Sequence, residues 1–157
     1  MAQPTTPVHD RGTATIAHTA PMSWAIMQLA HAQRSYAAER LAALGLFPGQ
    51  ELILDQLWRS DDGCSQKQLG ELLRLDHSTI AKSVQRLERN NLVHRERSPQ
   101  DGRVTIVRVT DAGRALESPV HSVWTDMESR WQQRLGDADG ATVAAALSAL
   151  AAGPSSD

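Results

Sequence analysis

The sequence has only one cysteine, Cys64, among its 157 residues. Counting alone therefore excludes an internal disulfide bond and a cysteine-rich zinc site. The chain also lacks an apolar run of the roughly 18 to 20 residues that a membrane helix needs, and residues 1–20 lack the basic-then-apolar layout of a secretory signal. We therefore expect a cytoplasmic protein that has no membrane partner.

The net charge is also small, because 16 basic residues face 18 acidic ones. With 41% apolar residues, this composition disfavours a disordered chain and suffices for one compact domain. The charge is uneven, however, because residues 65–110 hold nine basic and five acidic side chains, which gives this segment +4 and the remainder −6. A basic middle indicates a surface for a polyanion, although an ordinary solvated charged face is the other interpretation.

The spacing of apolar residues predicts a mainly helical chain with one β-hairpin. Helices are expected over 22–44, 48–59, 66–73, 77–90 and 111–135, with strands over 92–97 and 104–110 and a last alanine-rich helix that ends at Gly153-Pro154. Pro48 is expected to start the second helix. Pro119 is expected to kink the helix that follows Thr110 or to delay its regular part.

Two short helices joined by a three-residue turn and followed by a hairpin have the order of a winged helix-turn-helix. In this chain that order coincides with the basic segment, and Ser65 with Gln68 predicts a capping box at the first of the two helices. The expected fold class is mainly α with a small β-hairpin wing. The expected parts are a flexible arm at 1–20, a dimerisation helix at 21–47, a winged helix-turn-helix lobe at 48–110, dimerisation helices at 111–152 and a tail at 153–157.

Helix 77–90 has one apolar face and one polar face. At about 100° per residue, Ile80, Val84 and Leu87 fall on one side of the helix. The opposite side carries donors and cations, namely Ser78, Lys82, Gln85, Arg86 and Arg89. Such a face fits the major groove of double-stranded DNA, with Gln85 among the base contacts and Arg86 and Arg89 at phosphates. The alternative is a merely solvated amphipathic helix.

The expected hairpin tip carries Arg103 directly after Gly102. A minor groove has a negative potential that attracts guanidinium groups, so Arg103 is expected to enter it. Asp101 is expected to accept a hydrogen bond from Arg95 or Arg97 and so to stiffen the tip. A solvated arginine in a turn is the other interpretation of Arg103.

Two stretches resemble the multiple antibiotic resistance regulator (MarR) family of bacterial transcription factors. They are LAALGLFPGQELILDQLW and CSQKQLGELLRLDHSTIAKSVQRLERNNLVHRERSPQDGRVTIVRVTDAGRAL, and the resemblance covers about residues 24–151. The motif from Asp101 to Arg103, followed by Val109 to Gly113, is similar to the wing and the wing-to-helix joint of that family. Asn91 departs from the family pattern, which usually has glycine there, but asparagine tolerates the left-handed conformation.

The resemblance implies a homodimeric, ligand-responsive repressor that binds a pseudo-palindromic operator through its winged helix-turn-helix. It implies that Ser78 and Lys82 contact bases and that Arg103 reads the minor groove. It places phosphate contacts at Ser65, Gln66 and Lys67, and it places the dimer interface on helix 22–44 and the last two helices. It also implies a small aromatic or phenolic effector and no other cofactor. The candidate lining residues are Trp24, His31, Trp58 and Trp124, for which core packing is the alternative.

Cys64 is interpreted first as a simple structural or surface thiol, but it leaves other functions open. It precedes a helix N-terminus, a position that favours a reactive thiolate, so a redox-responsive regulator is one alternative and a cysteine-dependent enzyme is another. The enzyme lacks a placed base and oxyanion donors, and the histidines lack metal-like spacing, so we expect neither an enzyme nor a metal site. A dimerisation module that does not bind DNA is a third alternative, against which Lys82, Arg86 and Arg103 argue.

Overall fold

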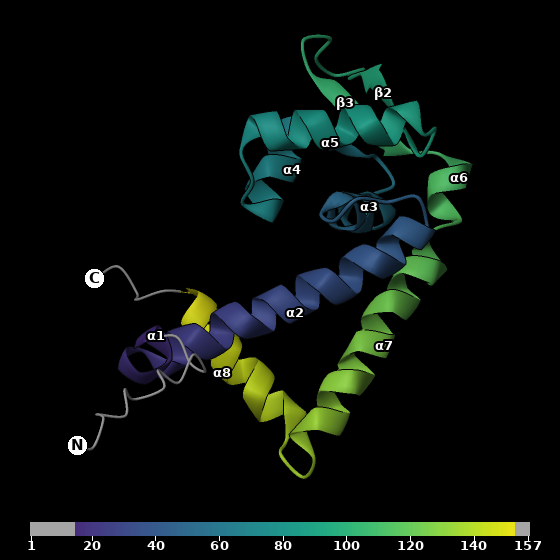
Figure 1. Cartoon of the computed structure of the whole chain (residues 1–157). Helices are drawn as coiled ribbons and strands as arrows, with labels where there is room; N and C mark the ends of the chain where they lie inside the picture. The colour runs from purple at the N-terminus through teal and green to yellow at the C-terminus, as the bar shows by residue number, and fades with distance from the viewer. Residues whose placement is uncertain (1–14, 153–157) are drawn as a thin grey trace, which may run out of the picture. The chain divides into compact units, whose positions relative to one another are not determined.

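The computed structural model describes residues 15–152, so the expected tail and residues 1–14 of the expected arm lie outside the described residues. The element order is α1 Thr15–Thr19, α2 Pro21–Ala43, α3 Gln50–Trp58, β1 Cys64–Ser65, α4 Gln66–Leu73, α5 His77–Arg89, β2 Val93–Arg97, β3 Thr105–Val109, α6 Asp111–Arg114, α7 Glu117–Leu135 and α8 Gly140–Ala152 (Figure 1). The chain divides into two units at the boundary between Ser35 and Tyr36, inside α2. The expected fold class, mainly helical with a small antiparallel sheet, is confirmed.

The described part of the first unit is helical throughout. Helix α1 lies within the segment expected to be an arm, where the sequence pattern did not predict a helix. The N–H of Ala20 donates to the carbonyl of Ile16 at 2.8 Å, and that of Trp24 donates to the carbonyl of Ala20 at 3.0 Å. Helical bonding therefore continues from α1 into α2, because these carbonyls satisfy N–H groups that a helix start leaves free.

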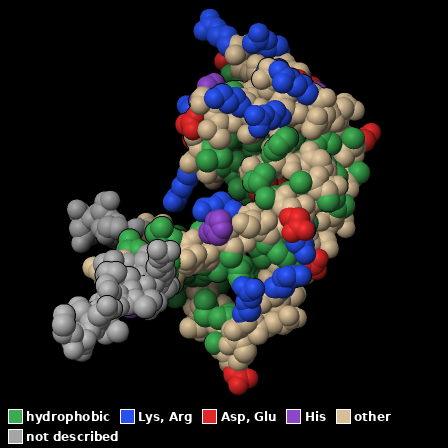
Figure 2. Space-filling model, viewed as in Figure 1, with side chains coloured by type: hydrophobic (Ala, Val, Ile, Leu, Met, Phe, Trp, Pro, Cys, Tyr) green, Lys and Arg blue, Asp and Glu red, His purple; other side chains and the backbone are tan. Residues whose placement is uncertain are grey.

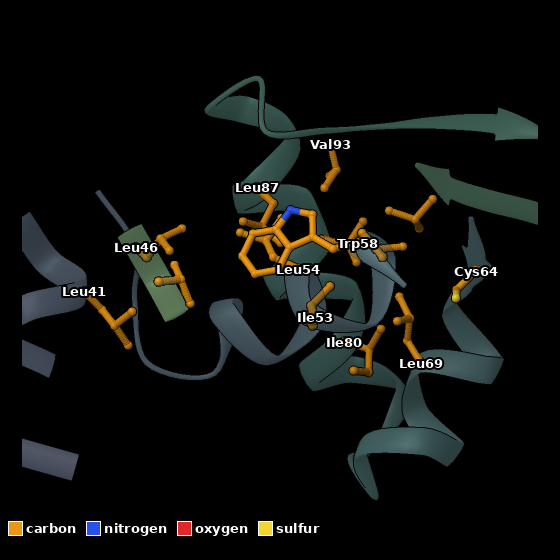
Figure 3. Packing of buried hydrophobic residues seen from close by; sticks show 14 of the residues in the cluster. Leu41, Leu46, Ile53, Leu54, Trp58, Cys64, Leu69, Ile80, Leu87 and Val93 are labelled. Atoms are coloured by element: carbon orange, nitrogen blue, oxygen red, sulfur yellow. The ribbon is translucent and has the colours of Figure 1, made fainter. Parts of the chain in front are cut away.

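The second unit has a continuous apolar core built mainly from α3, α4, α5 and the sheet. Leu54, Leu57, Ile80 and Leu87 are fully buried there, and Trp58 packs among them (Figure 3). The stripe predicted for helix 77–90 is confirmed, since Ile80, Val84 and Leu87 all face this core. One helical face thus supplies the apolar contacts, which leaves the opposite face of α5 to solvent.

The sheet has three strands in the order β1-β3-β2, all antiparallel. The predicted hairpin is present, with Val93 opposite Val109 and Arg97 opposite Thr105. The additional strand β1 has only two residues and pairs Cys64 with Val107. A two-residue strand has no periodicity of its own, so the sequence pattern did not predict it.

The helix boundaries differ from expectation in two places. Helix α3 begins at Gln50 rather than at Pro48, because its N-cap Gly49 has the left-handed φ of 93° and the helix starts only after it. The single helix expected after Thr110 is divided into α6 and α7, and Pro119 lies in the first turn of α7. Proline is tolerated in a first turn, where an N–H has no intrahelical partner, so its expected delaying effect is confirmed.

Helix α8 presents an apolar surface with little cover. It contains no charged residue and no buried residue, and Leu150 is 53% exposed. No helix in the described part of the chain combines the length and apolarity needed to cross a membrane.

Candidate nucleic-acid interface

The N-terminus of α5 is fixed by the side chain of Asp76. The Oδ1 atom of Asp76 accepts the backbone N–H of Thr79 at 2.9 Å and the hydroxyl of Ser78 at 2.7 Å, and Oδ2 accepts the hydroxyl of Thr79 at 2.6 Å. These hydrogen bonds, first those from the Thr79 and Ser78 hydroxyls, hold the pKa of Asp76 well below its ordinary value. Ser78 therefore has its proton committed to Asp76 and meets a further partner mainly as an acceptor.

The polar face predicted for this helix is present in the structure. Its residues, all exposed, are Ser78, Lys82, Gln85, Arg86 and Arg89. Figure 2 shows Lys and Arg side chains gathered over the part of the second unit that carries α5 and the hairpin. An α-helix fits the width of the major groove, and hydrogen-bond donors on its exposed side can reach acceptors on the base edges there.

Arg86, on the same face, makes a cation–π contact within the chain. Its guanidinium carbon lies 5.3 Å from the ring centroid of Phe47, which is 57% exposed at the end of the α2–α3 turn. The ring faces a cation at a distance at which the quadrupole attraction operates. Arg86 is therefore held toward the α3 side of the helix, as a phosphate contact at the rim of the face would be.

The predicted capping box at α4 is confirmed. The N–H of Ser65 donates to Oε1 of Gln68 at 2.8 Å, and the N–H of Gln68 donates to Oγ of Ser65 at 3.2 Å. Ser65 is thus engaged in the cap, whereas Lys67 is exposed and reaches Glu71 only at 3.9 Å. The helix start presents Gln66 and Lys67 outward in the way that a phosphate contact requires.

Arg74 is a site residue that the sequence reasoning missed. It closes α4 as the C-cap with a φ of 53°, a conformation in which its backbone N–H donates to the carbonyl of Gly70. Arg74 and His77 line a shallow depression together with Gln66 and Lys67. The signal for Arg74 in the sequence was its place in a three-residue turn between two helices. Such a turn brings the two helix ends together, and a basic residue in it lies close to both.

The hairpin tip is organised by Ser98 and Asp101. The buried hydroxyl of Ser98 accepts the N–H groups of Gln100 and Asp101, each at 3.3 Å. Oδ1 of Asp101 accepts the backbone N–H of Arg103 at 2.9 Å. The prediction that Asp101 pairs with Arg95 or Arg97 is therefore corrected, because its carboxylate is used locally. The Arg103 side chain is exposed.

The side chain of Arg95 pairs with α5 instead. Its Nε and Nη2 atoms donate to Oε2 of Glu88 at 3.0 and 2.5 Å. The bond from Arg95 is the main reason that the pKa of Glu88 is lowered, and the same bond raises the pKa of Arg95. Arg97 lies further along β2, opposite Thr105, and is exposed.

The four residues expected to line an effector pocket have different environments. Trp58 is 8% exposed, and its Nε1–H donates to the carbonyl of Gly113 at 3.1 Å. Trp58 is therefore a core residue, which corrects its assignment to a pocket. Trp124 packs half-buried against the same core, whereas Trp24 and His31 belong to the first unit.

Gly113 explains part of the motif that follows β3. A Cβ atom at this position would lie 2.0 Å from the carbonyl oxygen of Leu92, so only glycine fits. The hydroxyl of Thr110 donates to the carbonyl of Asn91 at 2.6 Å, and Asn91 has a φ of 56°, as its left-handed tolerance predicted. The joint between wing and helix is thus closed tightly against the turn after α5.

Cys64 is buried and lies in β1 against the core. This environment favours the structural interpretation of the thiol. Within residues 15–152, no group of three or more histidine, cysteine, aspartate or glutamate side chains is placed to hold a metal ion.

Comparison with protein families identifies a match between residues 47–105 and the family described as MarR. Among curated proteins, the uncharacterised HTH-type transcriptional regulator YdgJ of Bacillus subtilis is 33% identical over 73 residues, which are 46% of this chain and 44% of YdgJ. The HTH-type transcriptional regulator TtmR of Methylorubrum extorquens is 34% identical over 96 residues, which are 61% of this chain and 49% of TtmR. The chain thus spans about half the length of these curated relatives.

Solved structures with the same fold extend over more of the chain. The MepR–DNA complex of S. aureus has a TM-score of 0.77 at 22% identity, over 85% of this chain and 98% of MepR. A mutant MarR of E. coli complexed with operator DNA has a TM-score of 0.76 at 20% identity, over 88% of this chain and 99% of that protein. At these identities the likeness concerns the fold.

Proposed function

We propose that the chain, whose residues 47–105 match the MarR family, is a sequence-specific DNA-binding transcriptional regulator of that family. One observation carries this proposal: α5 buries an apolar stripe and exposes donors and cations on the opposite face, beside a hairpin with an exposed arginine at its tip. A reader of DNA sequence needs base-edge donors on a rigid element and cations at its margins. The protein acts as a regulator without catalytic activity, in the cytoplasm where bacterial DNA is found.

In the proposed complex α5 enters the major groove. Lys82 and Gln85, at the middle of the exposed face, contact base edges, and Ser78 accepts a hydrogen bond near the N-terminus of the helix. Arg86, Arg89 and the start of α4 neutralise phosphates on either side of the groove. Arg103 enters the adjacent minor groove from the wing.

A homodimer is proposed because α8 is apolar and uncovered. A helix with no charged side chain and no buried residue exposes an area that monomeric proteins normally cover. Helix α2 adds exposed apolar side chains in the first unit, among them Met22 and Met27 at 64% and 54% exposure. A two-fold dimer built on these helices presents two copies of α5 to a pseudo-palindromic operator.

Repression relieved by a small aromatic or phenolic effector is proposed from the likeness to the MarR family. The candidate contacts belong to different units, Trp24 and His31 to the first and Trp124 to the second, and each stays a separate prediction. Trp58 is omitted because it packs in the core. No other cofactor is proposed.

Sequencing of genomic DNA fragments bound by the purified full-length chain tests the function. We expect enrichment of one inverted repeat whose half-sites lie about one helical turn apart, roughly 10 to 10.5 base pairs. Fragments retained by Arg114→Ala, a change at an exposed cation of α6, should show the same motif. Retention of fragments without any shared sequence would refute the proposal.

Replacement of Arg103 by alanine should weaken operator binding without loss of stability. The side chain is exposed, and the Asp101 contact that organises the tip uses only the backbone N–H of residue 103. The salt dependence of binding should become shallower by about one unit, because one counterion fewer is released. An unaltered salt slope together with a lowered melting temperature would instead assign Arg103 to support of the wing.

Replacement of Cys64 by serine should leave both operator affinity and the response to peroxide unchanged. The thiol is buried in β1, so it is a poor target for oxidation to a sulfenic acid. Binding is measured with and without peroxide, and Cys64→Ala controls for a buried hydroxyl. Release of DNA by the oxidised wild-type chain, but not by either variant, would establish the redox-responsive alternative.

A further inference from the structure

We propose that the ion pair between Glu88 and Arg95 is a positioning clamp that sets the angle of the wing relative to α5, so that Arg103 and Lys82 reach one DNA site together. The inference rests on the proposed function. It assigns a role to an acidic residue of a surface that is basic on balance, a role that the DNA contacts by themselves do not explain.

The pair joins two different elements of the second unit. Glu88 lies in the last turn of α5, and Arg95 is the middle residue of β2. Two N–H groups of one guanidinium converge on a single carboxylate oxygen, Oε2 of Glu88. The side chains are only 39% and 32% exposed for Arg95 and Glu88, so solvent screens this pair less than a fully exposed one.

The position of the pair along the hairpin allows it to limit rotation of the wing relative to α5. The turn after α5 is already fixed at its base, where the N–H of Leu92 donates to the carbonyl of Leu87 and that of Thr110 donates to the carbonyl of Leu92. Arg95 attaches to α5 two residues beyond the start of β2. The Glu88–Arg95 contact is the sole ion pair between α5 and the hairpin in the described part of the chain.

A small rotation at the hairpin base would displace the tip. The six residue steps from Val93, at the start of β2, to Pro99, just beyond its end, span about 20 Å when extended, so a rotation of about 10° moves the tip by roughly 3 to 4 Å. That displacement exceeds the tolerance of a hydrogen bond, which is a few tenths of an ångström. Val93 is buried at the near end, and Val107, which pairs with Arg95 and with Cys64 of β1, is buried at the level of the ion pair. Beyond that level Arg97 and residues 99–104 of the tip are exposed, whereas Ser98 is buried.

The charge of Glu88 makes the proposal testable, because two effects of its removal have opposite signs. As a bare negative charge on a DNA-facing lobe, Glu88 repels phosphates, so its loss should tighten binding to any DNA. As one half of a clamp, Glu88 favours the one wing angle that suits the operator, so its loss should weaken operator binding.

Glu88→Ala is compared with a matched control, Glu71→Ala. Glu71 also pairs with a cation of the interface, Lys67 at 3.9 Å, but both residues lie on α4, so that pair joins no two elements. Both variants remove one carboxylate, free one basic side chain and introduce a good helix former. Affinities are measured by titration of a selected operator duplex and of a scrambled duplex.

We expect Glu88→Ala to bind the operator about fivefold more weakly and the scrambled duplex at least as tightly as the wild-type chain. Glu71→Ala should bind both duplexes as tightly as wild type or more tightly. The exchanged pair, Glu88→Arg with Arg95→Glu, restores the contact at unchanged net charge and should recover most of the operator affinity. Amide hydrogen exchange of the free protein should accelerate over residues 96–106 in Glu88→Ala and return to the wild-type rate in the exchanged pair.

The clamp is refuted if Glu88→Ala gains affinity for both duplexes, as Glu71→Ala does, and if exchange in the wing is unchanged. That result leaves the proposed function intact, because wild type still discriminates the operator. A wild-type chain that binds the two duplexes equally would instead refute the proposed function and the clamp together.

Discussion

Replacing Lys82 by alanine is expected to weaken binding selectively at one base position in each half-site, by about 1 to 3 kcal/mol. Lys82 is exposed at the middle of α5, four residues after Ser78, and its helix is held by buried Ile80, Val84 and Leu87. Loss of the side chain removes the proposed base contact and leaves no cavity in the core. The expected result is a change in sequence preference, with little change in melting temperature.

Arg89→Ala is the comparison for Lys82→Ala. Arg89 is exposed in the last turn of the same helix, where it is proposed to meet a phosphate. Its removal should weaken all DNA sequences alike and reduce the salt slope by about one. Competition with single-base operator variants distinguishes the two outcomes, and equal losses on every variant for Lys82→Ala would make it a phosphate contact.

Deletion of residues 136–157 is expected to abolish the dimer and to reduce operator affinity by about 10²-fold, because two linked half-site contacts become one. None of the residues of the apolar core of the second unit lies in α8, so the winged helix-turn-helix lobe should keep its fold. The truncated chain should sediment as a monomer or as aggregates formed through the exposed face of α7.

Sedimentation velocity of the truncated chain reports whether the dimer is lost, and thermal melting reports whether the fold is kept. A cooperative melting transition with loss of the dimer is the expected combination. A truncated chain that remains a well-folded dimer would contradict the proposed role of α8 and would place the interface elsewhere. Leu150→Glu, a single charge on the exposed side of α8, should reproduce the loss of the dimer at full chain length.

Much of the lobe was predictable from the sequence, because its signals are local. The capping box of Ser65 and Gln68 needs only residues three apart, and it starts α4 as expected. The stripe of Ile80, Val84 and Leu87 has a helical period, which predicted both the buried face and the polar face of α5. The sequence thus also predicted which cations lie on the exposed face of α5. The DNA contacts assigned to these cations stay predictions.

Other features depend on contacts between residues that are distant in the sequence, so they became visible only in the folded chain. Strand β1 exists because Cys64 pairs with Val107, and Gly113 is required because the backbone at Leu92 lies against it. Trp58 lies in the core rather than in a pocket, and its Nε1–H donates to the carbonyl of Gly113, 55 residues away.

The wing illustrates the physical reason most clearly. Asp101 and Arg95 have opposite charges and lie near each other in the sequence, so a bond between them was a reasonable prediction. In the folded chain the backbone N–H of Arg103 is the nearer partner of Asp101, and α5 brings Glu88 to Arg95. The positions of the charged residues and of the apolar helix faces could be read from the amino-acid order alone, because propensity and period are local properties. The partner of each charge was decided only by packing, since a hydrogen bond depends on distances of a few tenths of an ångström that no spacing along the chain specifies.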